Sequence, residues 1–237
     1  MRRLTGVEER LDGPLTDQRA LVGNLRDLAR VNRRLGGTRL SIAAIETLAP
    51  GRAAISILDV GTGGADIPLA LIDRGRARGR LVTVTGLDSR PEVLAAAEIA
   101  EPRVPATVEL ALQVGDGRSL PYGDDSFDLV HSSMVVHHLD PASARDLLTE
   151  MSRVARLGVV LNDLVRGRQF WLGAWLLSHL ATRNAFTRVD APLSVRRAYT
   201  VPEMTALLAA AGLRVERQFD GFAGHRVAFA ARRNGRP

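Results

Sequence analysis

Ile55-Ser56-Ile57-Leu58-Asp59-Val60-Gly61-Thr62-Gly63-Gly64-Ala65-Asp66-Ile67-Pro68 is the stretch that decides the fold of this sequence. It begins with a short apolar run rich in β-branched residues, which is typical of a strand buried on both faces. Three glycines within four residues end that run, and residues 67–72 resume with helical spacing. A strand, a glycine turn and a helix bring a ligand close to bare backbone at a helix N-terminus. We expect Asp66 to cap the helix and Pro68 to lie in its first turn.

Two classes of ligand use such a turn, and the local spacing separates them. The dinucleotide fingerprint G-x-G-x-x-G would need a glycine at position 66, where this chain has an aspartate. A carboxylate is unfavourable beside a pyrophosphate but acceptable beside a cationic or zwitterionic ligand, and Asp59 adds a second negative charge. An ordinary turn without a ligand is the remaining alternative.

Asp59-Val60-Gly61-Thr62-Gly63 resembles the first motif of the class I S-adenosylmethionine (SAM)-dependent methyltransferases, whose glycines pass under the methionine part of the cofactor. The usual last glycine of that motif is Ala65 here. Asp88 ends a strand predicted over residues 81–88, and the resemblance implies that it binds the ribose hydroxyls. NAD-binding enzymes also bind the ribose hydroxyls through an acid at this position, so Asp88 alone does not distinguish SAM from NAD.

The resemblance continues at Gly115-Asp116-Gly117, which follows a strand predicted over 106–114, and it covers roughly residues 52–161. It implies that Asp116 receives the adenine amino group, although a turn or N-cap aspartate is the alternative. The implied cofactor is SAM. The implied cofactor-binding residues are Asp59, Gly61, Thr62, Gly63, Asp66, Asp88, Ser89, Gly115, Asp116, Gly117 and Ser132.

Two adjacent histidines, His137 and His138, follow the fourth predicted strand at the end of the sheet that faces the site. Imidazoles can deprotonate an acceptor near neutral pH, so both are candidate catalytic residues, together with Asp163 after the fifth strand. The pair also resembles a His-His-Leu stretch of quinone-biosynthesis and related small-molecule methyltransferases, where it is commonly structural or lines the cofactor. Because neighbouring residues rarely serve one site, we expect at most one histidine to point inward. Asp163 alternatively caps the next helix. No His-x-x-x-His or carboxylate cluster at ligand spacing joins them, so no metal is expected.

The segment from Phe170 to Leu180 contains both tryptophans, Trp171 and Trp175, and is apolar on nearly every side. It is interpreted as a wall or lid for an aromatic or long-chain acceptor, with plain core packing as an equal alternative. The arginines that flank it leave shallow membrane association open. Arg197 and Tyr199 are expected to reach the same pocket.

Composition limits the classes of function. The 237 residues are 46% hydrophobic and 24% charged, which is ordinary for a soluble globular protein, and the absence of cysteine excludes disulfides and cysteine nucleophiles. Residues 153–237 carry 14 arginines against five acids. Such a basic region could touch nucleic acid or an anionic membrane, but a solvated face is the favoured interpretation. The first residues lack the apolar stretch of a secretory signal, so the expected location is cytoplasmic.

The predicted fold is a single α/β, Rossmann-like domain over residues 51–237. Its seven-stranded sheet is mostly parallel with an antiparallel C-terminal strand and has helices on both faces. Residues 1–50 form an N-terminal helical cover, with helices over 15–35 and from about 38 to 49. A substrate-pocket insertion is placed at about 164–200, and the end from residue 232 is expected to be frayed.

The predicted function is SAM-dependent methylation of a hydroxyl on a small, aromatic or polyketide-derived acceptor of secondary metabolism. C-methylation of a quinone precursor is the nearest alternative, and an inactive SAM-binding partner protein is another. Nucleic-acid methylation is disfavoured because no basic surface interleaved with aromatic residues is present. A homodimer remains open.

Overall fold

The computed structural model describes residues 1–235, so the predicted domain end at residue 237 lies outside the described part. At its centre is a seven-stranded sheet in the order β3-β2-β1-β4-β5-β7-β6. The strands from β1 to β5 are mutually parallel, whereas β7 runs antiparallel to both β5 and β6. This topology confirms the predicted fold class. The strands are β1 (Ala54–Val60), β2 (Leu81–Asp88), β3 (Leu110–Val114), β4 (Phe127–Ser133), β5 (Ala155–Leu164), β6 (Leu213–Asp220) and β7 (Arg226–Arg233).

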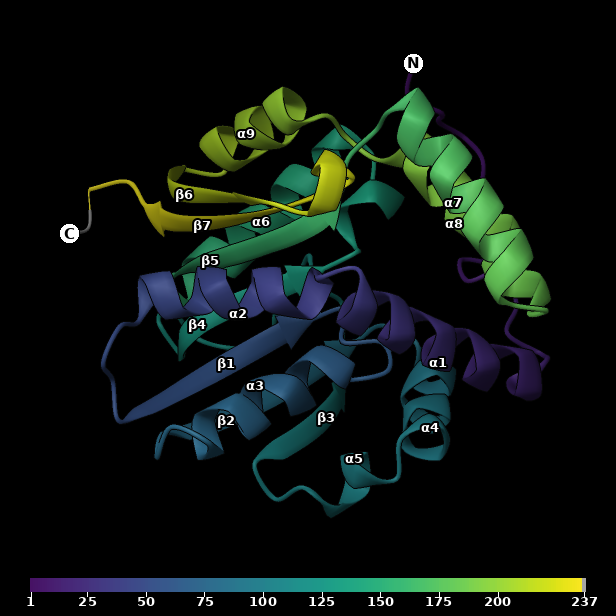
Figure 1. The fold of residues 1–237 in the computed structure, drawn as a ribbon. Helices are drawn as coiled ribbons and strands as arrows, with labels where there is room; N and C mark the ends of the chain where they lie inside the picture. The colour runs from purple at the N-terminus through teal and green to yellow at the C-terminus, as the bar shows by residue number, and fades with distance from the viewer. Residues whose placement is uncertain (236–237) are drawn as a thin grey trace.

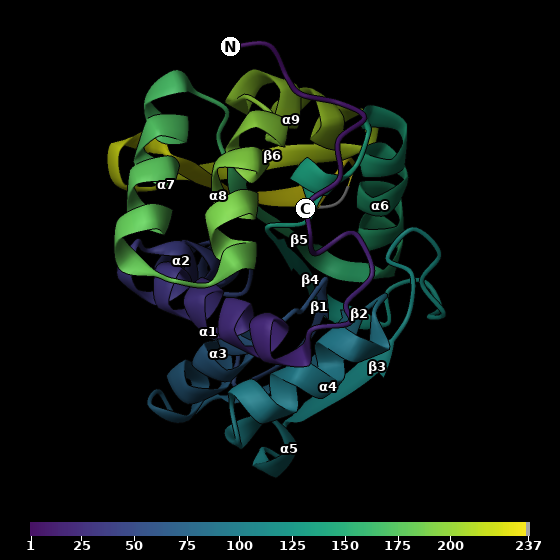
Figure 2. The ribbon, with the colours of Figure 1, turned by 90° about the vertical axis from the view of Figure 1, so that its right-hand side faces the viewer.

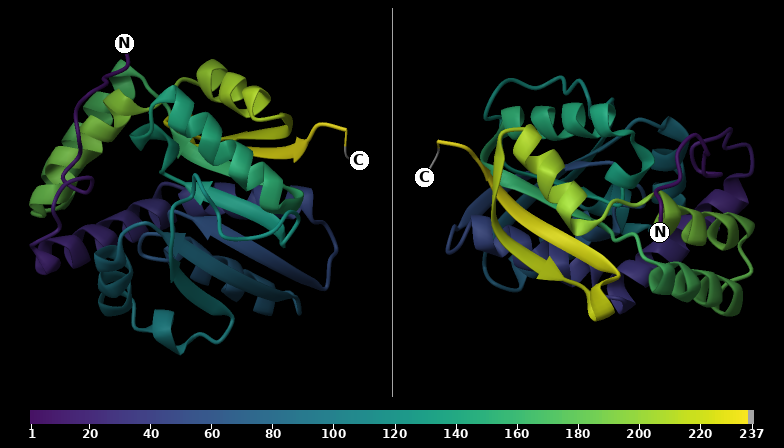
Figure 3. Two further views of the ribbon diagram at one scale, coloured as in Figure 1. Left: turned by 180° about the vertical axis from the view of Figure 1, so that it is seen from behind. Right: turned by 90° about the horizontal axis from the view of Figure 1, so that it is seen from above.

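Helices cover both faces of the sheet (Figures 1 and 3). On one face α2 (Gly37–Leu48) and α3 (Asp66–Arg76) pack over apolar side chains of β1, β2 and β7. On the other face α6 (Pro141–Val154) and α9 (Val201–Ala210) pack over β4, β5 and β7. Thr200 caps α9 and forms a capping box with Glu203.

Two expectations about strand ends are wrong. The third strand begins only at Leu110, because Arg103–Ala106 forms the short helix α5 and contains Pro105, which cannot donate to a strand ladder. The C-terminal end is not frayed from residue 232, since β7 continues to Arg233. The Arg232 guanidinium donates to the carbonyls of Leu48 and Leu157, which ties that end to the sheet.

The first 17 residues contain no helix or strand and turn back at residues 10–13, and we call them the N-terminal segment (Figure 2). It passes α8 (Ala185–Arg197), where the Leu4 amide donates to the Arg196 carbonyl, and then crosses the carboxyl ends of the parallel strands to reach α1. Helix α1 (Gln18–Arg34) packs on α4 (Pro91–Ala100). The N-terminal segment and α1 therefore both lie at the end of the sheet where ligands bind in open α/β folds.

A hairpin of two helices, α7 (Arg168–Ala181) and α8, occupies the region predicted to hold a substrate-pocket insertion (Figure 1). The sequence pattern does not predict α8, because it contains Pro192 and its apolar residues do not follow a helical period. The interpretation of this segment as a helix packed in the core is wrong, since Ser178 is the one buried residue of α7. No helix of the described residues is long and apolar enough to cross a membrane.

Candidate functional site

A cavity of about 700 Å³ opens at the carboxyl ends of β1, β2, β3 and β4. The parallel strands end at this edge, so the loops that follow them contribute its walls. The N-terminal segment, α1 and the end of α8 close it from the other side. Of the predicted site residues, the cavity is lined by Asp59, Gly61, Thr62, Gly63, Asp66, Asp88, Ser89, Gly115, Asp116, Gly117, His138 and Arg197.

The glycine turn forms the floor of this cavity. Gly61 has a φ of +72° and Gly63 a φ of +53°, which is left-handed backbone that favours glycine. A Cβ on Gly61 would run into the side chain of Val135, whereas a Cβ on Gly63 would meet nothing within 4 Å. The floor therefore presents open space directly above Gly63. Ala65 also has a positive φ, of 55°, and occupies the N-cap position that was predicted for Asp66.

Asp88 lies at the end of β2 and points back to the turn. Its carboxylate accepts hydrogen bonds from the amides of Gly63 and Arg90, each at 3.1 Å. Burial raises the pKa of Asp88, partly offset by those hydrogen bonds. Asp116, in the loop after β3, is more exposed and forms a 2.8 Å ion pair with Arg118, whose hydrogen bonds lower the pKa of Asp116. The two acids therefore line the same cavity, but the pKa of Asp88 is raised whereas that of Asp116 is lowered.

Two of the predicted cofactor-binding acids are engaged by other side chains. Asp59 is 3% exposed and accepts a 2.5 Å hydrogen bond from Nδ1 of the buried His131. Asp66 accepts from the Asn32 amide at 3.0 Å, and burial raises its pKa. Ser132, the remaining predicted cofactor residue, is fully buried, does not line the cavity and donates to the Val60 carbonyl.

The three predicted catalytic residues occupy two layers. His138 lines the cavity and its Nδ1 lies 2.9 Å from an oxygen of Asp12. His137 lies behind it, 1% exposed, with Nδ1 2.6 Å from an oxygen of Asp163. Burial alone would raise the pKa of Asp163, but the charge and hydrogen bonds of His137 outweigh it and lower that pKa. Asp163 is part of β5 and therefore does not cap the next helix.

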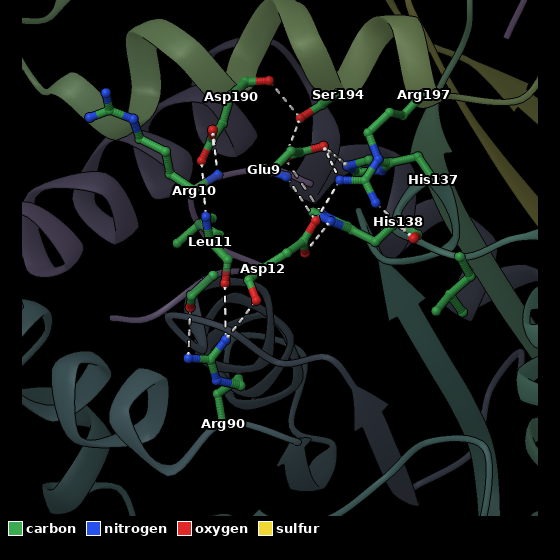
Figure 4. A network of polar contacts seen from close by, with 12 residues as sticks. Glu9, Arg10, Leu11, Asp12, Arg90, His137, His138, Asp190, Ser194 and Arg197 are labelled. Carbon is green, nitrogen blue, oxygen red and sulfur yellow. Dashed lines mark hydrogen bonds and ion pairs between the residues drawn. The ribbon is translucent and has the colours of Figure 1, made fainter. Parts of the chain in front are cut away.

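The N-terminal segment supplies side chains that the sequence did not single out (Figure 4). Asp12 forms a 2.5 Å ion pair with Arg197 as well as its contact with His138. Glu9 is 3% exposed, accepts from the Ser194 hydroxyl at 2.8 Å and has its pKa raised to about 7 by burial. The only sequence feature that could have indicated these residues is the mixture of acids with Arg10 in this segment, and such a mixture is more typical of a solvent-exposed charged surface.

The same segment is held along its length by backbone contacts. Asp190 of α8 accepts from the amides of Arg10 and Leu11. From the opposite side, the Arg90 guanidinium donates to the carbonyls of Leu11, Asp12 and Gly13. These contacts place Asp12 over the cavity between α8 and the end of β2 (Figure 4).

The predicted substrate-pocket residues separate into three positions. Arg197 lines the cavity. Tyr199 is buried beside it, donates to the Leu139 carbonyl at 2.8 Å and has its pKa raised to about 12 by burial. Trp171 and Trp175 do not line the cavity; they lie on the outer surface of α7, 36% and 41% exposed. The fold therefore does not bring the two tryptophans together with Arg197 and Tyr199 in one pocket.

Comparisons with known proteins agree with this fold. Residues 58–161 match the family described as "Methyltransferase domain". An uncharacterized methyltransferase of Synechocystis sp. (strain ATCC 27184 / PCC 6803 / Kazusa) is 32% identical over 142 residues, which make up 57% of this chain and 60% of that protein. The chain thus spans less than two thirds of the length of that relative.

Two solved structures are similar over most of the chain. The crystal structure of a SAM-dependent methyltransferase from Aquifex aeolicus gives a TM-score of 0.63 at 16% identity, covering 89% of this chain and 97% of that one. Human N-acetylserotonin methyltransferase in complex with SAM gives 0.62 at 17% identity, covering 94% of this chain and 61% of that one. At such identities the likeness concerns the fold.

Proposed function

Because residues 58–161 match the methyltransferase domain family, we propose that the chain is a class I SAM-dependent methyltransferase and that it transfers the SAM methyl group to a hydroxyl of a small acceptor. The observation that carries the proposal is the cavity at the strand ends, where the glycine turn, Asp88 and Asp116 lie along one wall and His138 and Arg197 lie near the N-terminal segment. One cavity thus offers a cofactor end and an acceptor end. The acceptor class that we propose is aromatic or polyketide-derived, as in secondary metabolism.

At the cofactor end, three features support a bound SAM. The open space above Gly63 would take the methionine part, Asp88 would accept hydrogen bonds from the ribose hydroxyls, and Asp116 would meet the adenine amino group. Asp116 would exchange part of its ion pair with Arg118 for that contact. A dinucleotide would bring its pyrophosphate close to Asp66 and Asp88, which is unfavourable.

At the acceptor end, His138 is the predicted catalytic residue that lines the cavity, and Asp12 orients its ring. We propose that the acceptor hydroxyl lies beside His138. His137 and Asp163, which lie behind His138, would hold it in position. In the transfer the acceptor oxygen would form a bond to the methyl carbon as the carbon–sulfur bond breaks with its electron pair left on sulfur, and the hydroxyl proton would pass to Nε2 of His138, whose Nδ1 faces Asp12. Most of the acceleration would come from holding the two reactants in line.

The outer surface of α7 supports a lipophilic acceptor. Its large apolar side chains are exposed to solvent over a third or more of their surface: Trp171, Leu172, Trp175, Leu176, Leu177 and Leu180. We propose that this face makes weak contact with a membrane surface, or with a second copy in a homodimer, when a poorly soluble acceptor is delivered. No nucleic-acid substrate is proposed.

SAM is expected to stabilise the protein against heat, whereas NAD is not. At about a hundred times its dissociation constant, a ligand that binds only the folded state adds about 2.7 kcal/mol. For a chain of this size that corresponds to a rise in the melting temperature of about 5–10 °C. Thermal-shift measurements with SAM, S-adenosylhomocysteine and NAD check this, and stabilisation by NAD alone would overturn the cofactor assignment.

The glycine turn provides a matched pair of substitutions. Gly63→Ala is expected to weaken SAM binding, because the new methyl group would occupy the open space above the turn, and to cost about 1–2 kcal/mol of backbone strain. Gly61→Ala is expected to carry the same strain and in addition about 1–3 kcal/mol of overpacking against Val135. Chemical unfolding and SAM titration of both variants separate the two effects. If the Gly63 variant binds SAM as tightly as the unchanged protein, the cofactor does not cross Gly63.

Measurements of turnover distinguish O-methylation from the two alternatives, C-methylation and an inactive SAM-binding protein. Incubation with SAM and a panel of phenols, hydroxylated polyketides and quinone precursors should release S-adenosylhomocysteine with one of the hydroxyl-bearing acceptors. A product methylated on a ring carbon would replace O-methylation by C-methylation. SAM binding without turnover on any acceptor would favour an inactive partner protein.

A further inference from the structure

We propose that Glu9, His137 and His138 bind one divalent transition-metal ion at the acceptor end of the cavity. Their three donor atoms, a carboxylate oxygen and two imidazole nitrogens, lie within 4.8 Å of one another. Imidazole and carboxylate together suit Zn²⁺, Fe²⁺, Ni²⁺ and Co²⁺. The spacing of these residues along the sequence does not predict a metal site, because Glu9 belongs to the N-terminal segment whereas the two histidines follow β4.

The distances favour a shared ion over a hydrogen bond. The Glu9 carboxylate lies 3.8 Å from Nε2 of His137 and 3.9 Å from Nε2 of His138. Both separations are too long for a hydrogen bond, whose heavy atoms approach to about 2.7–3.2 Å. Two ligands that are each about 2.1 Å from one ion lie about 3.4 Å apart in tetrahedral geometry. The two separations from the Glu9 carboxylate, which run to different oxygens, would therefore close by about half an ångström on loading, and the widest donor–donor separation, up to 4.8 Å, would close by more.

One donor atom is buried without a partner. Nε2 of His137 makes no hydrogen bond within residues 1–235, although its side chain is 1% exposed. A buried polar atom that lacks a partner has given up its hydrogen bonds to water without replacement, so its burial needs an explanation. The atom faces Glu9, and a metal ion between them would satisfy both.

Both imidazoles are oriented in the way that metal ligands are. Nδ1 of His137 lies 2.6 Å from Asp163, and Nδ1 of His138 lies 2.9 Å from Asp12. A carboxylate on Nδ1 fixes the tautomer in which the lone pair is on Nε2, and it makes that nitrogen a better ligand. The two rings, 4.2 Å apart at their centroids, thus direct both lone pairs toward the same carboxylate.

The local charge also accommodates a dication. The charged side chains in contact with the three donors are Asp12, Asp163 and Arg197. With neutral imidazoles, these two carboxylates and that of Glu9 carry three negative charges, and the guanidinium returns one. Arg197 is bound mainly to Asp12, at 2.5 Å, and lies 3.4 Å from Glu9. The net charge of these contacting groups is negative, which favours a cation at the donors.

His138 and Asp12 line the cavity, so an ion can enter from it. Three protein ligands leave one position of a tetrahedral ion open, as in catalytic sites. An acceptor oxygen would then meet the ion instead of a free imidazole. That last consequence rests on the proposed function, but the metal site does not.

Titration of the full chain, without an affinity tag and after chelator treatment, tests the proposal. Co²⁺ should bind at one ion per chain with the visible absorption of four-coordinate cobalt, and Zn²⁺ should displace it. Glu9→Gln and His138→Gln should each weaken binding at least about tenfold, since even outer-shell changes cost about 10–100-fold. Glu8→Gln, the adjacent acid on the same segment, is the matched control and should bind as the unchanged protein does.

Two results would overturn the site: no stoichiometric binding of Co²⁺ or Zn²⁺, or equal binding by the Glu9, His138 and Glu8 variants. Circular dichroism and the melting temperature of each variant show whether it is folded, and the half-buried His138 provides a ligand variant if Glu9→Gln does not fold. SAM affinity is measured on the same metal-free samples. Failure of SAM binding would count against the methyltransferase proposal and leave the metal result intact.

Discussion

Arg226→Met is expected to lower the free energy of unfolding by about 3–5 kcal/mol, the cost of removing one member of a buried charged network. Arg226 is 2% exposed, and burial lowers its pKa to about 10. Its guanidinium donates to Asn162, Asn32 and Ser133 at 2.6, 2.7 and 2.6 Å. Methionine would fill much of the same volume but leave the buried oxygens of Asn162 and Asn32 unpaired, at about 1–3 kcal/mol each, together with the partly buried hydroxyl of Ser133.

The substitution would also disturb the site, because the Arg226 network reaches it. Asn32, which donates to Asp66 on the cavity wall, receives one of the three hydrogen bonds. The positive charge of Arg226 also opposes the rise that burial causes in the pKa of Asp66. Loss of the guanidinium therefore removes a positive charge that partly compensates the buried Asp66 carboxylate.

Arg214→Met on the neighbouring strand β6 is the control for the Arg226 experiment. Its guanidinium is 59% exposed and forms a 2.7 Å ion pair with Glu216, a surface interaction worth about 0–1 kcal/mol. Denaturant unfolding of both variants makes the comparison. Equal shifts of the two midpoints would mean that the buried network does not stabilise the fold.

Local pattern was sufficient for most of the sheet and for the cofactor end of the site. The glycine turn and Asp88 could be found from sequence because each lies directly after a strand whose apolar run marks its end. The positions of such residues follow from the parallel arrangement alone, since the carboxyl ends of all parallel strands meet at one edge.

Contacts between distant parts of the chain could not be predicted in this way. Glu9 meets the histidines more than 120 residues later, and Arg226 meets Asn32 across 194 residues. No spacing rule connects such positions, and the N-terminal segment has no helical or strand period to orient its side chains. The apolar pattern of α7 likewise could not distinguish a buried helix from an exposed one, because both read as a continuous apolar run.

Asp88→Asn is expected to weaken SAM binding by about 10- to 150-fold, because a hydrogen bond to a charged group is worth about 1.5–3 kcal/mol. Asparagine keeps the size of the side chain but offers one acceptor oxygen in place of two. In the ligand-free protein both oxygens are already used, by the amides of Gly63 and Arg90. The ribose hydroxyls would add to these contacts through the remaining lone pairs.

Asp116→Asn provides the comparison for Asp88→Asn, since both acids line the cavity. Asp116 is exposed and paired with Arg118, so its loss should change the SAM affinity only a few-fold, as expected for a surface interaction of about 0–1 kcal/mol. Calorimetric titration with SAM measures both, and the unfolding midpoint without ligand detects any loosening of the turn. An unchanged affinity in Asp88→Asn would remove the ribose role from Asp88, and a larger loss in Asp116→Asn would shift the main polar anchor of the cofactor to the adenine end.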